Sequence, residues 1–192
     1  MVVSLGMFAC ILSGGIDLSV GSNLAVASVF MASLMNTTNF WIALLATLAF
    51  CMVIGAVNGF IVSRLRIAPF IVTLGMTEFA RGIAYWYTGS SPVSWRDAGD
   101  AAIMTFIGKG RILGIPVLTV IMIVIILLTM FIMRKTVVGR ITYAIGGNEQ
   151  AVRLSGINTL WWKMFPYIFS GFCCAVGGIL MTARLGLGAP TN

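Results

Sequence analysis

The stretch ILGIPVLTVIMIVIILLTMFIM, residues 112 to 133, contains no charged side chain. A bilayer core about 30 Å thick is crossed by a helix of about 20 apolar residues, so this stretch is long enough to span it. Two further stretches, 40 to 63 and 164 to 183, have the same character. Because a transmembrane β-barrel shows short alternating segments and no unbroken apolar runs, all three stretches predict transmembrane helices.

The composition of the whole chain agrees with a membrane environment. Of the 192 residues, 59% are hydrophobic and 9% are charged, whereas soluble domains have about 25% charged residues. The 35 residues before Asn36 are too long for one upright span, so they predict two short spans or one span and a broken piece. We therefore expect an all-α polytopic transmembrane helix bundle, with about five to six spans or broken spans in one domain over residues 1 to 192.

The net charge of +7 is concentrated in alternate loops. Segments 64 to 66 and 134 to 163 hold seven lysines and arginines, whereas segments 36 to 39 and 89 to 111 hold three. The positive-inside rule places the first two segments in the cytoplasm. The charge therefore indicates membrane topology, and we expect no nucleic acid partner.

This topology requires residues 67 to 88 to cross the membrane, although the segment contains Glu78 and Arg81. The two side chains are three residues apart on one helical face, where they can pair. One interpretation is a helix buried in the bundle with a structural ion pair. The other is that the pair lines a water-filled cavity.

The residues used in common enzyme sites are scarce. The sequence has no histidine and no phosphate-binding loop of the form G-x-x-x-x-G-K-[ST], so we expect no metal site, no cofactor and no ATP site in this chain. Asp17 has no partner aspartate in another span, which excludes an intramembrane aspartyl protease. The four cysteines are predicted to be reduced packing residues: Cys10, Cys51, Cys173 and Cys174. The chain is therefore not predicted to be an enzyme.

The segment SGGIDLSVGS, residues 13 to 22, carries the only charge among the first 63 residues. An aspartate at mid-bilayer costs about 2.5 to 3.5 kcal/mol on insertion scales, so the surrounding structure must compensate for it. Gly14 and Gly15 can end one helix with a left-handed residue, and Asp17 or Ser19 can cap the next. Gly21 is expected to permit close backbone approach.

Two interpretations of this segment remain open. Interrupted helices line substrate or ion sites in transporters, which favours a functional Asp17. Alternatively, Asp17 only caps a helix in a turn at the membrane surface. Elsewhere, Gly55 and Gly59 in the GAVNG sequence permit close helix packing.

A second polar segment lies within the predicted cytoplasmic loop 134 to 163. Gly146 and Gly147 lead to Asn148 as an N-cap, residues 149 to 155 fit two helical turns, and Gly156 ends them. Ala151 and Leu154 lie three residues apart on one side, which suits docking into a partner's groove. The alternative is a helix that lies on the lipid surface, although it lacks a broad apolar face.

The segment SGGIDLSVGS, together with RIAPFIVTLGM (66 to 76) and YAIGGNEQAVRLSGIN (143 to 158), resembles the membrane permease of bacterial ribose-type sugar ABC importers. The resemblance implies a multi-pass protein of the bacterial cytoplasmic (inner) membrane. It also implies three partners: a cytoplasmic ATP-binding cassette subunit that binds ATP, a second permease subunit, and an extracytoplasmic sugar-binding protein. The residues that resemble the ATPase-coupling loop are Gly147, Asn148, Glu149, Ala151, Arg153, Ser155 and Gly156.

The resemblance implies that the chain forms part of a translocation path for a small sugar. The candidate pathway residues are Asp17, Ser19, Ser22 and Asn23, with Gly14, Gly15 and Gly21 as structural residues of the signature segment. Family members have further segments at both ends, so the chain is expected to be a fragment. The alternatives are a permease for branched-chain amino acids or autoinducer-2, and a nonfunctional truncated protein or small membrane protein that only binds partners.

Overall fold

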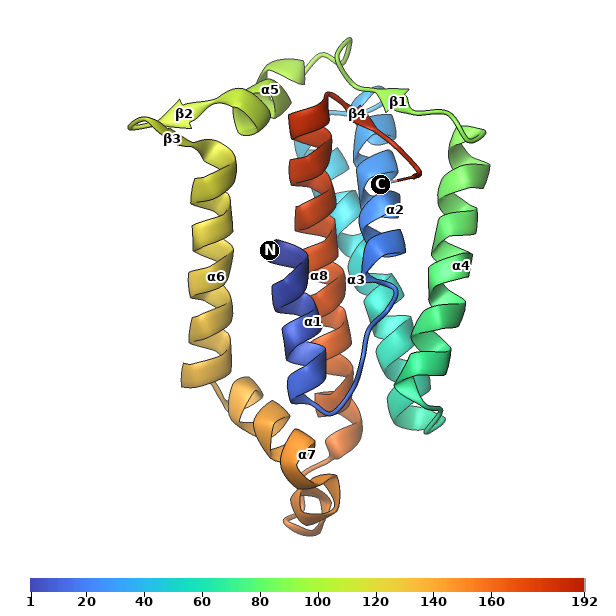
Figure 1. Cartoon of the computed structure of the whole chain (residues 1–192), viewed down its shortest axis with the longest axis vertical. Helices are drawn as coiled ribbons and strands as arrows, with labels where there is room; N and C mark the ends of the chain where they lie inside the picture. Colours follow the sequence, from blue (N-terminus) through green and yellow to red (C-terminus); the bar gives the residue numbers. More distant parts are fainter. Residues whose placement is uncertain (192) are drawn as a thin grey trace.

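Helices aligned with one long axis dominate the computed structural model, which describes residues 1–191 (Figure 1). They are α1 (Val2–Leu12), α2 (Val20–Met35), α3 (Phe40–Arg64), α4 (Pro69–Thr88), α5 (Ala101–Lys109), α6 (Val117–Lys135), α7 (Val137–Leu154) and α8 (Thr159–Leu185). Two antiparallel strand pairs lie at one end. They join β1 (Val93–Ser94) to β4 (Leu187–Gly188), and β2 (Arg111–Ile112) to β3 (Ile115–Pro116). The predicted all-α membrane bundle is confirmed.

Three helices in the described residues are long and apolar enough to cross a membrane: α3, α6 and α8. Helix α3 matches the predicted span 40 to 63, and α8 begins before the predicted start at 164. Helix α6 begins at Val117 and not at 112, because Leu113 and Gly114 have φ values of 53° and 83° and form a turn. The N–H group of Val117 donates to the Gly110 carbonyl oxygen at 3.0 Å, which closes this hairpin.

The first 35 residues form two short helices separated by a break, as predicted. Helices α1 and α2 contain 11 and 16 residues. At a rise of about 1.5 Å per residue, neither crosses a 30 Å hydrocarbon core alone. Figure 1 shows α1 in the half of the bundle nearer α7 and α2 in the other half, joined by the non-helical residues 13–19.

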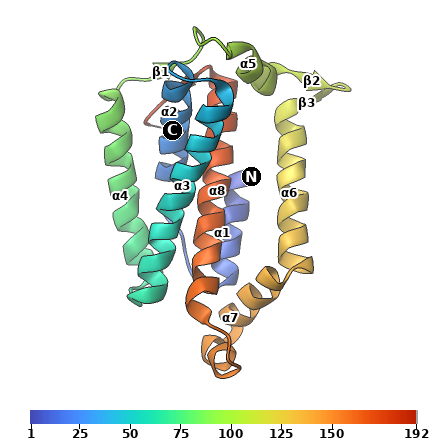
Figure 2. The same ribbon diagram turned by 180° about the vertical axis from the view of Figure 1, so that it is seen from behind.

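The connections between helices alternate between the two ends of the bundle (Figures 1 and 2). The turn 65–68 and α7 lie at one end, whereas the turn 36–39, α5 and the strand pairs lie at the other. Helix α4 joins the two ends of the bundle, as the expected topology requires of residues 67 to 88, but it is not among the three helices long and apolar enough to span, so its crossing of the membrane stays a prediction. The basic segments 64 to 66 and 134 to 163 therefore lie at the same end.

Helix α8 packs against α1, α2 and α3 in the centre of the bundle (Figure 2). Glycines make this close packing possible. A Cβ atom at Gly55 would collide with the backbone of Tyr167, and one at Gly59 would lie 2.9 Å from the Cα of Met164. The predicted packing role of both glycines is confirmed, and small residues set the distance between α3 and α8.

Helix α4 packs on the bundle with only one side, where Thr73, Ala80 and Ala84 are buried. Glu78 and Arg81 are exposed on this single chain. They form no ion pair, since the one ion pair in the described residues joins Lys163 and Glu149. The predicted buried pair is therefore wrong, because the buried side of α4 is made of small and hydroxyl-bearing residues.

The four cysteines occupy the interior, as the sequence predicts. All of them are free thiols and all are buried. Three of them, Cys51, Cys173 and Cys174, belong to the closely packed helices α3 and α8. Their compact side chains fill the interior between the helices.

We expect Gly55→Ala to lower the midpoint of thermal unfolding in detergent. Overpacking costs about 1–3 kcal/mol, which exceeds the gain of about 1 kcal/mol from replacing glycine by alanine in a helix. Gly82→Ala in α4 is the matched control, because nothing lies within 4 Å of its added Cβ. Equal midpoints for the two variants would contradict the described contact between α3 and α8.

Candidate functional site

The break between α1 and α2 begins with two glycines in special positions. Gly14 has a φ of 77°, so the predicted left-handed residue at the end of α1 is confirmed. A Cβ atom at Gly15 would collide with the Tyr167 hydroxyl. Two hydrogen bonds satisfy a carbonyl group in the last turn of α1. The N–H group of Gly15 and the hydroxyl of Ser13 donate to the Cys10 carbonyl oxygen at 2.9 and 2.8 Å.

The Asp17 side chain lies inside the bundle and is 3% exposed. Its Oδ1 accepts hydrogen bonds from the backbone N–H and the hydroxyl of Ser19, at 3.0 and 2.6 Å. Its Oδ2 accepts from the Ser170 hydroxyl of α8 at 2.7 Å. The predicted alternative, a cap in a turn at the membrane surface, is wrong, because the carboxylate is buried and bonded to a neighbouring helix.

Side chains from the other helices complete this polar cluster. The Asn58 amide of α3 donates to the Ser19 hydroxyl at 3.0 Å. The Thr77 hydroxyl of α4 donates to the Leu18 carbonyl oxygen at 3.1 Å. A broken helix is tolerated in a membrane only where its free backbone groups find partners inside the protein. Helix α4 supplies partners for backbone carbonyls of the break, and α3 and α8 supply partners for its polar side chains.

Two more polar residues at the start of α2 point inward. The Ser22 hydroxyl donates to the Ser19 carbonyl oxygen at 3.0 Å, and the Asn23 amide donates to the Cys51 carbonyl oxygen at 3.4 Å. Three buried atoms have no hydrogen-bond partner in the described residues: Asn23 Oδ1, Asn58 Oδ1 and the Tyr167 hydroxyl. An amide oxygen accepts and a phenol donates, so these atoms suit water or a hydroxyl-bearing solute.

The structure brings together all four predicted pathway residues. Each of them is buried at the start of α2 or just before it: Asp17, Ser19, Ser22 and Asn23. Their contact with a solute stays a prediction. The expected close approach at Gly21 is wrong, since nothing lies within 4 Å of a Cβ placed there. Ser19 holds the N-cap position of α2, but its side chain accepts no bond from the helix backbone.

Sequence reasoning missed Asn58, Thr77 and Ser170. Asn58 lies between two glycines whose spacing was assigned to packing alone. Its signal was a lone amide in the apolar stretch of α3. Within the described chain, no group of three or more His, Cys, Asp and Glu side chains is placed to hold a metal ion.

Helix α7 contains the second predicted polar segment and is kinked inside it. Asn148 has φ −158° and ψ 96°, which are not helical values. Its Oδ1 accepts from the N–H group of Ala151 at 3.0 Å, so the predicted N-cap is confirmed. The predicted helix end at Gly156 is also confirmed, since its φ is 86°. The part before the kink, 137 to 147, is helical as well, which the sequence analysis did not predict.

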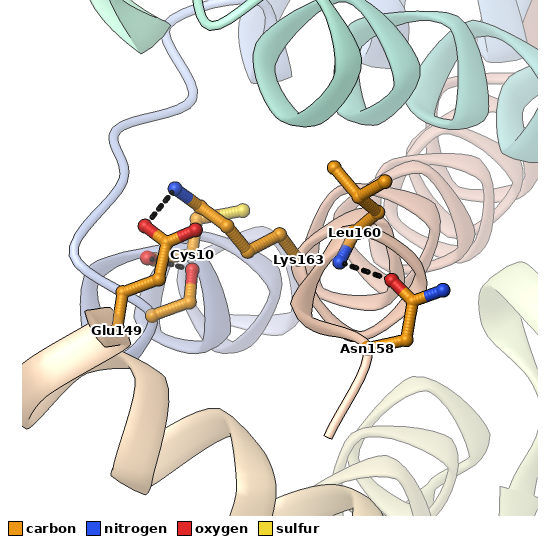
Figure 3. Close-up of polar contacts among 6 residues, drawn as sticks. Cys10, Glu149, Asn158, Leu160 and Lys163 are labelled. Atoms are coloured by element: carbon orange, nitrogen blue, oxygen red, sulfur yellow. Dashed lines mark hydrogen bonds and ion pairs between the residues drawn. The ribbon is translucent and has the colours of Figure 1, made fainter. Parts of the chain in front are cut away.

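The part of α7 after the kink is exposed on most of its surface, with Val152 buried, and one ion pair joins it to α8. Leu154 is 89% exposed. Glu149 Oε2 lies 2.8 Å from Lys163 Nζ (Figure 3). The same view shows the N-cap of α8, where the Asn158 side chain accepts from the N–H group of Leu160 at 3.2 Å. Arg153 is exposed nearby, and Ser155 donates to the Val152 carbonyl oxygen at 2.7 Å.

The two polar segments meet at a contact between glycines. A Cβ atom at Gly146 would collide with the Leu12 carbonyl oxygen, and one at Gly14 would lie 3.9 Å from the Gly146 Cα. The packed part of α7 therefore contacts the last residue of α1, where the break begins. In contrast, nothing lies within 4 Å of a Cβ placed at Gly147.

A family profile for the permease component of branched-chain amino acid transport systems matches residues 1–192. The chain belongs to this permease family. The match covers both the break at residues 13–19 and the kinked helix α7. No solved structure matches the chain.

Three curated relatives of this permease family member are named for sugars. The ribose import permease protein RbsC of Escherichia coli (strain K12) is 40% identical over 191 residues, which are 99% of this chain and 60% of RbsC. The fructose import permease protein FruF of Bifidobacterium longum (strain NCC 2705) is 40% identical over 96% of this chain and 52% of its own length. The L-arabinose transport system permease protein AraH of Escherichia coli (strain K12) is 34% identical over 98% of this chain and 57% of its own length. The chain thus spans between half and two thirds of these relatives.

Replacing Asp17 by alanine is expected to destabilise the bundle, because the buried hydroxyl groups of Ser19 and Ser170 lose their acceptor. An unsatisfied buried group costs about 1–3 kcal/mol. Ser170→Ala should lower the free energy of unfolding by less than Asp17→Ala does. The double variant should lower it by less than the sum of the two single changes, because both single changes remove the same bond between Ser170 and Asp17. Unfolding free energies in mixed detergent measure this coupling.

Thr105→Ala is the matched control, because this exposed hydroxyl bonds only to the carbonyl oxygen of Ala101 in its own helix. The control should not couple to Asp17→Ala. Additive costs for the Asp17 and Ser170 changes would show that the described bond does not stabilise the fold.

Proposed function

We propose that the chain acts as a permease subunit of an ATP-driven importer for a small sugar of the ribose type, in the bacterial cytoplasmic membrane. The observation that carries this proposal is the match of nearly the whole chain to import permeases named for ribose, fructose and arabinose. The family description names branched-chain amino acids, so a solute of that kind is the second candidate. The sugar relatives, at 34–40% identity, favour the first.

The proposed importer has three further components. A cytoplasmic ATP-binding cassette subunit binds and hydrolyses ATP, a second permease subunit completes the path, and an extracytoplasmic sugar-binding protein delivers the solute. The seven basic residues at the α7 end support a cytoplasmic location for that end. This chain performs no covalent chemistry in the proposed cycle.

The exposed part of α7 is the proposed docking site for the ATPase. Ala151 and Leu154 are exposed on it, and the Asn148 cap and Gly156 fix where it begins and ends. Movement of this helix reaches the interior at the contact between Gly146 and Leu12, and through the ion pair to α8. The ATPase cycle would thereby change the geometry of the break at residues 13–19.

The polar cluster at the break is the proposed contact for the solute. Its hydroxyl and amide groups come from Asp17, Ser19, Ser22 and Asn23, and they bond within the chain in this conformation. A conformation that opens the bundle would let these groups exchange internal hydrogen bonds for bonds to sugar hydroxyl groups. Such exchange binds the solute weakly, which suits release on the other side.

We expect Leu154→Arg to abolish co-purification of the ATP-binding cassette subunit from the same genome, and to lower ATP-dependent uptake of labelled ribose at least about tenfold. A charge in a docked apolar contact costs well over 1.4 kcal/mol, the value of a tenfold change. The fold should be unchanged, since the side chain is 89% exposed.

Leu113→Arg is the matched control, because Leu113 is 98% exposed at the opposite end of the bundle. It should leave the complex with the ATPase intact. Retention of the ATPase by Leu154→Arg would refute docking at α7. Uptake of a branched-chain amino acid and not of ribose, arabinose or fructose by the assembled importer would replace the sugar assignment.

A further inference from the structure

A cavity of about 840 Å³ opens at the α7 end of the bundle. Its lining comes from Gly14 of the break, the end of α3, the turn 65–68, the start of α4, the exposed part of α7 and the start of α8. Its charged residues are four basic side chains and one acid: Arg64, Arg66, Arg153, Lys163 and Glu149. We call it the basic cavity.

Most of the positive charge in the basic cavity is not neutralised by the chain. Glu149 pairs with Lys163, and this is the one ion pair in the described part of the protein (Figure 3). Arg64, Arg66 and Arg153 therefore have no carboxylate partner there. Three like charges around one cavity repel each other, and an anion among them would remove that repulsion.

Two helices begin at the basic cavity and two end there. Pro69 and Thr159 line it at the starts of α4 and α8, whereas Arg64 and Arg153 line it in the last turns of α3 and α7. A helix N-terminus carries about half a positive charge and unpaired N–H groups that favour anions. The Asn158 side chain takes only one of these N–H groups at α8, that of Leu160.

A second basic surface at the same end serves as the comparison. Met133, Arg134, Lys135, Arg140 and Tyr143 line it. Arg134 and Lys135 lie in the last turn of α6, and Arg140 lies near the start of α7. Removing charge there measures the general attraction of anions to this end of the bundle, and not binding in the basic cavity.

Apolar side chains around the basic cavity indicate what kind of anion it takes. Leu65, Phe70 and Trp161 are 60%, 53% and 70% exposed next to its lining residues. They lie next to the ends of α3, α4 and α8 at the basic end of the bundle, and the ends of membrane-spanning helices are where lipid headgroups meet basic side chains. An amphiphilic anion satisfies both features, since its phosphate meets the arginines and its chains meet the apolar rim.

We propose that the basic cavity binds the phosphate headgroup of an anionic phospholipid, and binds a diphosphate lipid such as cardiolipin most tightly. Guanidinium groups bind phosphate oxygens in bidentate pairs, and three arginines are available for two phosphates. The proposal uses only the charge, backbone and apolar rim of this chain, so it does not depend on the proposed transport function.

The test is native mass spectrometry of the full chain in detergent, with added cardiolipin, phosphatidylglycerol or phosphatidylcholine. In micelles no bilayer surface attracts lipids, so only lipids held by a site remain bound. We expect cardiolipin to bind tightest and phosphatidylcholine weakest. Arg64→Gln with Arg153→Gln should weaken cardiolipin binding about 25-fold, from a factor of about five for each arginine.

The matched control is Arg134→Gln with Arg140→Gln, which removes the same charge at the same end and should change binding less than about twofold. Equal losses in the two double variants would overturn the proposal, as would equal binding of phosphatidylcholine. Inorganic phosphate alone is the further probe: binding that cardiolipin does not compete away would assign the cavity to a free anion. Arg64→Lys with Arg153→Lys keeps the charge, and intermediate binding is expected because the bidentate geometry is lost.

Discussion

The hydrogen bonds of the Asp17 carboxylate constrain the bundle, because they form where two helices end inside it. The membrane core contains no water to pair polar groups, so the protein must supply every partner of the break. Ser170 of α8 reaches the carboxylate, Asn58 of α3 reaches Ser19, and Thr77 of α4 covers a backbone carbonyl. Three helices are thereby held around one short extended segment.

Close helix packing and these hydrogen bonds support each other. The serine side chain at 170 is short, so it reaches Asp17 only if α8 lies near the end of α1. Glycines allow this approach: a Cβ at Gly6 would lie 2.7 Å from the Cα of Ser170, and one at Gly171 would collide with the Cys51 backbone. Small residues at a membrane helix contact thus serve a polar bond as well as van der Waals contact.

Local patterns predicted those features that depend on neighbouring residues in sequence. Apolar length predicted α3, α6 and α8, and residue type predicted the left-handed Gly14 and the Asn148 cap. The bonds from Ser170 and Asn58 join residues 153 and 39 positions apart, and a single hydroxyl or amide in an apolar helix does not show which distant residue it bonds. The prediction of close backbone approach at Gly21 was wrong for the same reason, since the role of a glycine depends on which helix lies opposite it.

The kink in α7 separates a packed part from an exposed part, and the two parts contact different helices. The packed part contacts the last carbonyl of α1 through Gly146, whereas the exposed part reaches α8 through Glu149 and Lys163. Helix α1 leads directly into the break, and α8 supplies Ser170 to the carboxylate. Both of these contacts therefore end on helices that lead to Asp17 or bond it, whereas α7 also packs against α6. Helix α7 thus meets the break through α1 and α8, and Thr77 of α4 bonds the break from the other side of the bundle.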